Sequence, residues 1–586
     1  MSKGVIDIQE AAPWLEAETP PGWRVNQEGV FRVPDDPEKD PVLVSGPVWV
    51  AGLTRDENGS DWGVLVRWID LDRELRKWAM PRARLHDQGA GVAQDLARGG
   101  LFVAPGRERD LARYLGSARP ERRFRCVTRL GWVDTTDGRL LFVLPHEVIG
   151  TRVGEAEEVV FQAEKYAPTH AFRAEGDLAA WREAVAKPCG DHPALVFALC
   201  WALAAPLLKP AGIGGAGAHF FGASSTGKTT LAQVAASVWG CGADPAAAPE
   251  LSMVRTWRTT ANALEGIAAT HCDTLLPLDE LGLCAASDVG AVVYELAGGA
   301  GKARMSDSAR LQKTRTWRTL FLSTGEISIR QKIEERGRMA HAGQLVRALD
   351  IPAEAGIIRA PNGAAPREIA DRLKAAAGTF YGTAGPELVR RLVAETKEFG
   401  TLRGEVRTIL DLLARDLTPA QARPDQARAV RLLALAGTAG FLAQELGVLP
   451  WDNEVIVGAL RFVLDAWTDV APHLSDAARG VERVREFILR HRARFQALAD
   501  PSADVPRDRA GFVTADGDFL ILPSAFAEAV GDLDHRAVAR ELLARQLLKV
   551  DQSDRLVSKA PRSADAGRPP VYWVRAALLE EEGDAP

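Results

Sequence analysis

The chain has 586 residues and a formal net charge of −6. Hydrophobic residues make up 46% and charged residues 26%, an ordinary globular composition that excludes a fibrous or largely disordered chain. The length is several times that of a typical domain of ~100–200 residues and predicts several compact units. An acidic chain does not coat nucleic acid as a strongly basic protein does, so any DNA contact has to be local.

Cysteine usage and apolar runs favour a cytoplasmic protein without a membrane partner. The six cysteines include no CxxC pair, which indicates neither a zinc site nor a disulfide framework and is typical of a reducing compartment. The N-terminus has no positive segment followed by an apolar one, so a secretion signal is not expected. The longest apolar run, Ala194–Leu208, has about 15 residues and contains Pro206, which is short of the ~20 that cross a bilayer. We interpret it as a buried helix.

Four domains are predicted in chain order. Residues 1–165 carry short β-like runs separated by Gly, Asp and Asn, which predicts a mostly-β domain. From 166 to 352, apolar strands alternate with helices, the pattern of an α/β core with a parallel sheet and flanking helices. Residues 353–475 have helical periodicity and predict a helical subdomain.

The last domain, 476–586, has an element order that resembles a winged helix. We expect helices at 481–497, 524–530 and 535–546, and strands at 512–513, 519–522, 547–550 and 571–574. Basic residues on the helix at 535–546, with Arg536 and Arg540 among them, favour contact with a DNA backbone. The alternative is a solvated charged face on a protein-docking winged helix.

A phosphate-binding loop is the strongest motif. Its pattern GxxxxGKT follows an apolar strand and opens a helix. Backbone N–H groups of such a loop wrap the β-phosphate, the lysine neutralises the β- and γ-phosphates, and the threonine hydroxyl holds Mg²⁺. The residues expected to bind ATP here are Gly222, Ala223, Ser224, Ser225, Thr226, Gly227, Lys228, Thr229 and Thr230.

Two acids end a second apolar strand, about fifty residues further on, which we expect to lie next to the first in the sheet. Asp279 is predicted to hold Mg²⁺ together with Thr229, and Glu280 to orient and deprotonate the attacking water. A third apolar strand ends in Ser323 and Thr324, whose hydroxyls are candidates to sense the γ-phosphate. Ordinary turn chemistry is the alternative for this last pair.

Arginine is abundant between Arg304 and Arg347, and oligomeric ATPases usually take one arginine from a neighbouring subunit. Arg347 is our choice for this role. A structural salt bridge is the alternative, and Arg336 or Arg338 are possible substitutes. Lys302, Arg304 and Lys313 lie in a basic stretch that predicts a DNA-gripping loop facing a central pore, with a solvated face as the alternative.

Several segments together resemble the domain-of-unknown-function 927 family between about Trp23 and Trp467. They are Trp257-Arg-Thr-Thr-Ala-Asn262-Ala-Leu-Glu265, Leu278-Asp-Glu-Leu281, Gly301-Lys-Ala-Arg304, Ser323-Thr-Gly-Glu326 and Gly343-Gln-Leu-Val-Arg347. The resemblance implies an AAA+ ATPase, akin to the replicative helicases of mobile genetic elements, that assembles as a hexamer around DNA. It also places Arg347 where minichromosome-maintenance helicases carry Ser-Arg-Phe-Asp, which implies a finger role.

The leading hypothesis is therefore a hexameric, ATP- and Mg²⁺-dependent DNA helicase or translocase, acting on single-stranded or forked DNA for a phage, plasmid or integrated element. The alternative is a regulatory or defence AAA+ ATPase that acts on protein partners, hydrolyses ATP slowly and ignores DNA.

Overall fold

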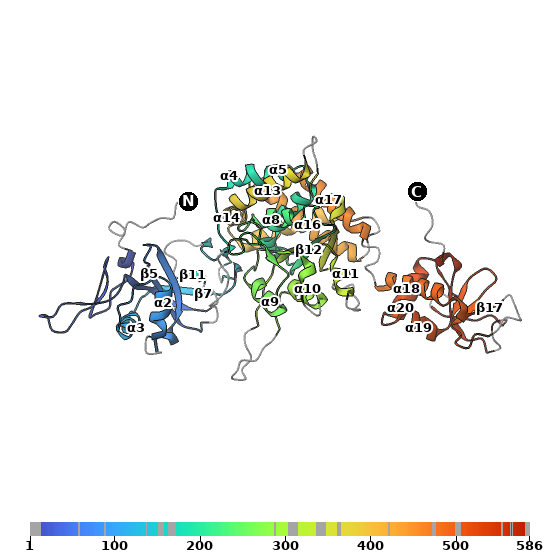
Figure 1. The fold of residues 1–586 in the computed structure, drawn as a ribbon, viewed down its shortest axis with the longest axis horizontal. Helices are drawn as coiled ribbons and strands as arrows, with labels where there is room; N and C mark the ends of the chain where they lie inside the picture. Colours follow the sequence, from blue (N-terminus) through green and yellow to red (C-terminus); the bar gives the residue numbers. More distant parts are fainter. Residues whose placement is uncertain are drawn as a thin grey trace.

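The computed structural model describes residues 13–56, 59–86, 90–135, 138–150, 157–161, 171–285, 289–302, 314–335, 347–359, 365–419, 422, 424–470, 476–498, 505–551, 555–562, 564 and 567–579. Figure 1 shows three bodies in a row, with the N-terminal residues at one end, a large central body, and the C-terminal residues at the other end.

The N-terminal body contains two sheets and two helices. An antiparallel sheet consists of β1 (Trp23–Asn26), β2 (Gly29–Arg32) and β3 (Val42–Ser45). A five-stranded sheet has the order β11-β7-β4-β5-β6, with β4 at Val48–Arg55, β5 at Gly63–Ile69, β6 at Leu75–Pro81, β7 at Arg123–Val127 and β11 at Glu157–Phe161. The helices are α2 (Ala90–Arg98) and α3 (Glu108–Ser117).

Both faces of the larger sheet are buried, which explains why β4 and β5 read as nearly continuous apolar runs. Val48 and Val50 of β4 share a core with Leu96 of α2 and Leu111 of α3, whereas Trp49 belongs to a separate cluster on the other face. The difference follows from the two-residue period of a strand, which sends successive side chains to opposite faces.

Three short strands after β7 pack on the central body. The antiparallel strands β8 (Gly131–Val133), β9 (Leu141–Val143) and β10 (Val148–Ile149) place Trp132 in the central hydrophobic core, where its Nε1 donates to the Pro206 carbonyl at 2.6 Å. Residues between Val127 and Ile149 thus contribute to the central core, whereas β11, later in the chain, pairs with β7 in the N-terminal sheet.

The predicted parallel sheet of the central body is confirmed. Its order is β13-β14-β15-β12-β16, and every pairing is parallel. The strands are β12 (Ala216–Phe221), β13 (Arg255–Thr256), β14 (Leu275–Asp279), β15 (Leu320–Gly325) and β16 (Ala348–Pro352). The interspersed helices are α8 (Lys228–Ala236), α9 (Ala261–Ala269), α10 (Val289–Gly298) and α11 (Ile329–Glu334).

The expectation that the acid-bearing strand lies next to the first strand is wrong. β15 hydrogen-bonds to both β12 and β14 and so lies between them. All three strands are apolar and buried, and hydropathy alone does not say which buried strand is central. The Ser323-Thr324 strand is consequently flanked by the two strands that carry the other motifs.

Helices complete the central body and share its core. They are α4 (Leu178–Trp181), the π-helical turn η4 (Arg182–Ala186), α5 (Lys187–Cys189), α6 (Pro193–Ala204), η5 (Ala205–Leu207), α7 (Leu208–Ala211), α13 (Pro366–Thr379), α14 (Ala384–Thr396), α15 (Phe399–Leu417), α16 (Pro424–Glu445) and α17 (Asn453–Val470). In α13, for example, the buried Ile369, Leu373 and Ala377 recur every four residues, as expected of an amphipathic helix.

The predicted buried helix is confirmed, but it is longer than expected. The helical run from Pro193 to Ala211 has 19 residues, because Pro206 lies within the 3₁₀ segment η5 and does not end the run. By length and composition this run is able to cross a membrane. It is nevertheless 94% buried inside the protein, against α8, α16 and α17, as the core helix of a soluble protein would be.

The C-terminal body has its own hydrophobic core. It contains α18 (Asp476–Arg490), β17 (Phe495–Ala497), β18 (Gly511–Val513), β19 (Phe519–Ile521), α19 (Pro523–Val530), α20 (His535–Ala544), β20 (Leu548–Lys549), β21 (Ser558–Lys559) and β22 (Pro570–Val574). The first helix ends before the predicted residue 497, since Phe495–Ala497 pairs with Gly511–Val513 as a parallel strand.

Candidate nucleotide site

The loop between β12 and α8 has a backbone that only glycine tolerates at its ends. Gly222 has φ +147° and Gly227 has φ +97°. A Cβ at Gly222 would lie 2.5 Å from Oε1 of Glu354. Ser225, between them, also takes a left-handed φ of +68°. The loop therefore leads tightly into the first turn of α8, where unpaired backbone N–H groups favour an anion.

Lys228 is folded against this loop. Its Nζ donates to the carbonyls of Gly222 at 2.9 Å and Ala223 at 2.6 Å, and lies 3.4 Å from Oγ1 of Thr226. The side chain is buried, as is the neighbouring Thr230. The Lys228 ammonium thus donates to neutral oxygens at the centre of the loop, where a phosphate would be bound.

Asp279, at the end of β14, accepts hydrogen bonds from a hydroxyl of α8 and a hydroxyl of β15. Its Oδ2 accepts from Oγ1 of Thr229 at 3.5 Å, and its Oδ1 accepts from Oγ1 of Thr324 and from the Glu280 N–H at 3.1 Å. Carboxylate and hydroxyl oxygens are the hard ligands that Mg²⁺ takes at about 2.1 Å, and two oxygens 3.5 Å apart can reach one such ion. The chemistry of Thr229 and Asp279 therefore fits Mg²⁺.

Glu280, the residue after Asp279, has a strained backbone conformation. Its backbone is left-handed, with φ +62° and ψ +73°, which is costly for a residue with a side chain. Partial burial raises the pKa of its carboxyl above the ordinary value, and the negative charges of Asp279 and Glu326 raise it further. A carboxylate with a raised pKa is a stronger base, as general-base catalysis requires.

Ser323 and Thr324 point in opposite directions, because successive side chains of a strand alternate. Only Thr324 reaches Asp279. Ser323 is fully buried, and its Oγ accepts from Nε1 of Trp257 at 2.8 Å and lies 2.9 Å from Nδ1 of His219. The structure thus brings Thr324 to the candidate site and places Ser323 in a buried polar network.

The His219 ring in this network is neutral. Burial, with a smaller effect of the Lys228 charge, lowers its pKa to about 4. Its Nε2 lies 2.9 Å from the Ile327 carbonyl, which can only accept, so Nε2 carries the proton and Nδ1 accepts from Ser323. The network is therefore fully satisfied without any ligand.

Arg347 lies at the other edge of the sheet. It directly precedes β16, and its carbonyl accepts from the Gly217 N–H at the start of β12 at 2.8 Å. Its guanidinium carbon stands 3.9 Å from the ring centroid of Tyr294 on α10, a cation–π contact. Because the loop follows the opposite end of β12, Arg347 is separated from the loop of its own chain by the length of the strand.

Of the three DNA contacts predicted in the basic stretch, the structure describes Lys302 alone. Lys302 forms an ion pair with Oε1 of Glu295 at 3.1 Å. Arg304 and Lys313 lie outside the described residues, as do the substitutes Arg336 and Arg338.

In the C-terminal body, the exposed Arg536 and Arg540 are four residues apart on α20 and therefore share one face of that helix.

Two acids near the loop were missed as site residues. Glu354 lies against Gly222, and Glu326 accepts a hydrogen bond from the Ser224 hydroxyl in the loop. Both follow the carboxyl ends of strands, β16 and β15 respectively, and these ends gather at one edge of a parallel sheet. Their place directly after predicted strands was the sequence signal that could have identified them as site residues.

The comparisons with known proteins first define the fold class. The chain has the fold of a solved structure described as "SCCmec type IV Cch - active helicase", with a TM-score of 0.71 and 17% sequence identity over 95% of this chain and 99% of that one. No curated protein matches the sequence. The model of the family "Domain of unknown function (DUF927)" matches residues 23–317, half of the chain. The chain therefore belongs to the DUF927 family, which confirms the family resemblance over these residues; the segments after residue 317 that carry the resemblance lie outside the match.

Proposed function

We propose that this protein is an ATP-dependent DNA helicase or translocase with an AAA+ P-loop core. One observation carries the proposal: Lys228, Thr229, Asp279 and Glu280 converge at the carboxyl edge of one parallel sheet, the first two at the start of α8 after β12 and the last two at the end of β14. The shared fold with a protein described as an active helicase supports motion on nucleic acid as the use of this chemistry.

The residues divide the reaction among them. The loop N–H groups and Lys228 bind the β- and γ-phosphates of ATP, and Thr229 and Asp279 hold Mg²⁺, which neutralises phosphate charge when it is bound. Glu280 takes a proton from water while the water oxygen bonds to the γ-phosphorus and the bond from that phosphorus to the bridging oxygen of ADP breaks. Thr324 orients the Asp279 carboxylate.

The remaining assignments follow from this core. The subunits form a ring, most simply a hexamer, in which Arg347 acts on the loop of the neighbouring subunit. Lys302, Arg304 and Lys313 contact DNA in the pore, and a C-terminal winged helix contacts it through Arg536 and Arg540. The four domains span residues 1–165, 166–352, 353–475 and 476–586. The order of elements in the C-terminal body and the exposed Arg536 and Arg540 on α20 support the winged-helix assignment.

ATP hydrolysis and unwinding of a forked duplex test the proposal. The wild type should hydrolyse ATP only with Mg²⁺, faster with single-stranded DNA, and should unwind the fork. Lys228→Ala should lose ATP binding. Glu280→Gln should keep ATP binding and lose about 10²–10⁴-fold in rate, the range of a general base.

The pH profile tests the role of Glu280 separately. Glu280 must be ionised to accept a proton, and its pKa is raised, so the hydrolysis rate should rise with pH through that raised pKa. A wild type that hydrolyses ATP slowly, neither unwinds nor responds to single-stranded DNA at any salt concentration, and binds protein partners would instead establish the regulatory or defence function.

A further inference from the structure

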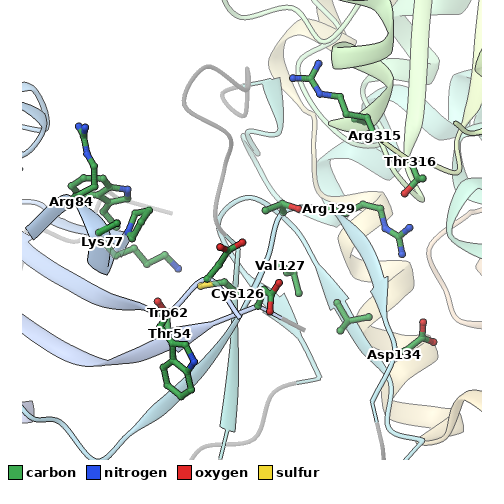
Figure 2. Close-up of a pocket in the computed structure, with 18 of the residues that line it drawn as sticks. Thr54, Trp62, Lys77, Arg84, Cys126, Val127, Arg129, Asp134, Arg315 and Thr316 are labelled. Carbon is green, nitrogen blue, oxygen red and sulfur yellow. The ribbon is translucent and has the colours of Figure 1, made fainter. Parts of the chain in front are cut away.

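A large cleft lies between the N-terminal and central bodies. It encloses about 1280 Å³. Figure 2 shows Lys77 and Arg84 on the N-terminal wall, Arg315 and Thr316 on the central wall, and Arg129 between them. Sites for small molecules usually enclose ~300–1,000 Å³, so this cleft has room for an extended polymer.

Trp62 gives the cleft an exposed aromatic surface. The chain has 15 tryptophans, all of them among the described residues, and Trp62, 45% exposed, is the most exposed of them. The guanidinium carbons of Arg55 and Arg123 lie 6.0 and 5.9 Å from its ring centroid. An exposed ring beside two cations is the arrangement on which proteins stack the bases of a single strand next to its phosphates.

Among the described residues, two bases of the cleft lining are without an acid partner, although acids line the cleft as well. The lining contains the basic residues Lys77, Arg84, Arg129 and Arg315 and the acidic residues Asp56, Asp61, Asp95 and Asp134. Arg84 pairs with Asp95, and Asp134 pairs with Lys209. Lys77 and Arg129 also line the cleft, and neither forms an ion pair with an acid of the described chain.

The surroundings of Lys77 favour an anionic partner. Burial lowers the pKa of its ammonium, and the nearby charge of Arg67 lowers it further. A phosphate beside Lys77 would offset both effects.

The cleft also meets the segment that the proposed function assigns to DNA. Its central wall includes Thr314, Arg315 and Thr316, the residues that directly follow the segment containing Arg304 and Lys313. The segment proposed to bind DNA and this wall of the cleft are therefore adjacent along the chain.

We propose that this cleft binds single-stranded DNA, with a base stacked on Trp62 and phosphates on Lys77, Arg123 and Arg129. The proposal rests on the proposed function, since it extends the DNA path of the same motor. The bases of a duplex are already stacked on one another and cannot lie on Trp62, so the cleft selects the single strand.

Fluorescence anisotropy without ATP tests the proposal, using a labelled 20-nucleotide oligo-dT, a 20-base-pair duplex and a 20-nucleotide oligo-U over a range of salt. Trp62→Ala should weaken oligo-dT binding about tenfold, in line with the loss of one stacked base, and Trp62→Phe should restore most of it. Lys77→Ala with Arg129→Ala should lower the slope of log affinity against log salt by about 0.7 for each lost phosphate contact.

Matched controls lie in the same N-terminal body outside the cleft. Leu71→Ala removes an exposed apolar side chain and Lys39→Ala an exposed cation, and neither should change affinity. Circular dichroism should show all variants folded. Unchanged oligo-dT affinity in both Trp62→Ala and the double variant would overturn the proposal, as would tighter binding of the duplex or of oligo-U.

The binding assay separates this proposal from the proposed function. If the wild type unwinds a fork and the cleft variants bind oligo-dT normally, the helicase function stands and the cleft is not the single-strand site. If the wild type binds oligo-dT through the cleft but does not unwind a fork, the cleft is a single-strand site and the helicase function fails.

Discussion

The two edges of the central sheet are built in opposite ways. At the carboxyl edge, Glu280 has a left-handed backbone and stands close enough to Asp279 and Glu326 that their charges raise its pKa. At the amino edge, the fully buried Asp273 takes two hydrogen bonds of 2.7 Å from Arg318 and one of 2.9 Å from the Trp132 N–H. Mutually repelling carboxylates collect at one edge and satisfied pairing at the other, while the backbone is left-handed at both Glu280 and Asp273.

The difference indicates what each edge is for. A cluster of mutually repelling groups is stabilised by a ligand that brings positive charge, such as Mg²⁺ with a nucleotide. The bidentate pair of Asp273 and Arg318 leaves no hydrogen-bonding group for a ligand. Asp273 instead holds β8 against the sheet by accepting from the Trp132 N–H. Arg347 is the exception, because it lies at the amino edge and yet has a proposed catalytic role.

Replacing Arg347 should have the largest effect on ATP hydrolysis, and its outcome tests whether the amino edge of the sheet is purely structural. Arg347→Ala should lower the ATP hydrolysis rate by about 10³–10⁵-fold, the range for a finger arginine, with little change in ATP affinity. Arg347 is supplied in trans, so mixing this variant with Lys228→Ala should regain activity at interfaces that combine one intact loop with one intact arginine. Arg367→Ala, whose side chain is 92% exposed, is the control. If the mixture shows no gain, Arg347 serves only its contact with Tyr294.

Removing Asp273 should have the next largest effect, on stability. Asp273→Ala leaves the Arg318 guanidinium and the Trp132 N–H unpaired in the interior, and it should lower the free energy of unfolding by about 3–5 kcal/mol in chemical denaturation.

The chain offers a matched control for Asp273 in a second bidentate pair. Arg494 donates to Glu528 at 2.9 and 3.0 Å on the surface of the C-terminal body. Glu528→Ala should therefore cost less than about 1 kcal/mol. Equal losses for the two variants would mean that burial does not distinguish the amino-edge pair.

The smallest effects are expected for Thr324 and Ser323, two neighbours in β15 that face opposite sides of the sheet. Thr324→Val removes a hydrogen bond to the Asp279 carboxylate, worth about 1.5–3 kcal/mol, and should slow hydrolysis roughly tenfold or more besides lowering stability by a similar amount. Ser323→Ala leaves Trp257 and His219 short of a partner and should cost about 1–3 kcal/mol of stability alone. Steady-state kinetics and thermal unfolding of both variants separate the roles, and the reverse pattern would show that Ser323 is the residue acting on nucleotide.

The sequence predicts well whatever a short stretch of chain decides. The loop from Gly222 to Thr229 has its geometry set by its own glycines, and the helix and strand around it follow from local hydropathy. The order of strands is different, because each buried strand is equally apolar and the place of β15 between β12 and β14 depends on how whole crossovers pack.

Single side chains show the same limit. Strand alternation requires Ser323 and Thr324 to face opposite sides, but the assignment of sides depends on Trp257 and His219, which are distant in sequence. The cleft around Trp62 combines residues from Thr54 to Thr316, and no local pattern predicts it.

The buried run Pro193–Ala211 has a consequence for synthesis of the protein. Its covering helices α16 and α17 begin about 200 residues later in the chain. At ~5–20 residues per second, a ribosome needs on the order of 10–40 s to reach them. During that interval the most apolar stretch of the nascent chain lacks its final cover, and a chaperone that binds emerging apolar segments would find its main target there.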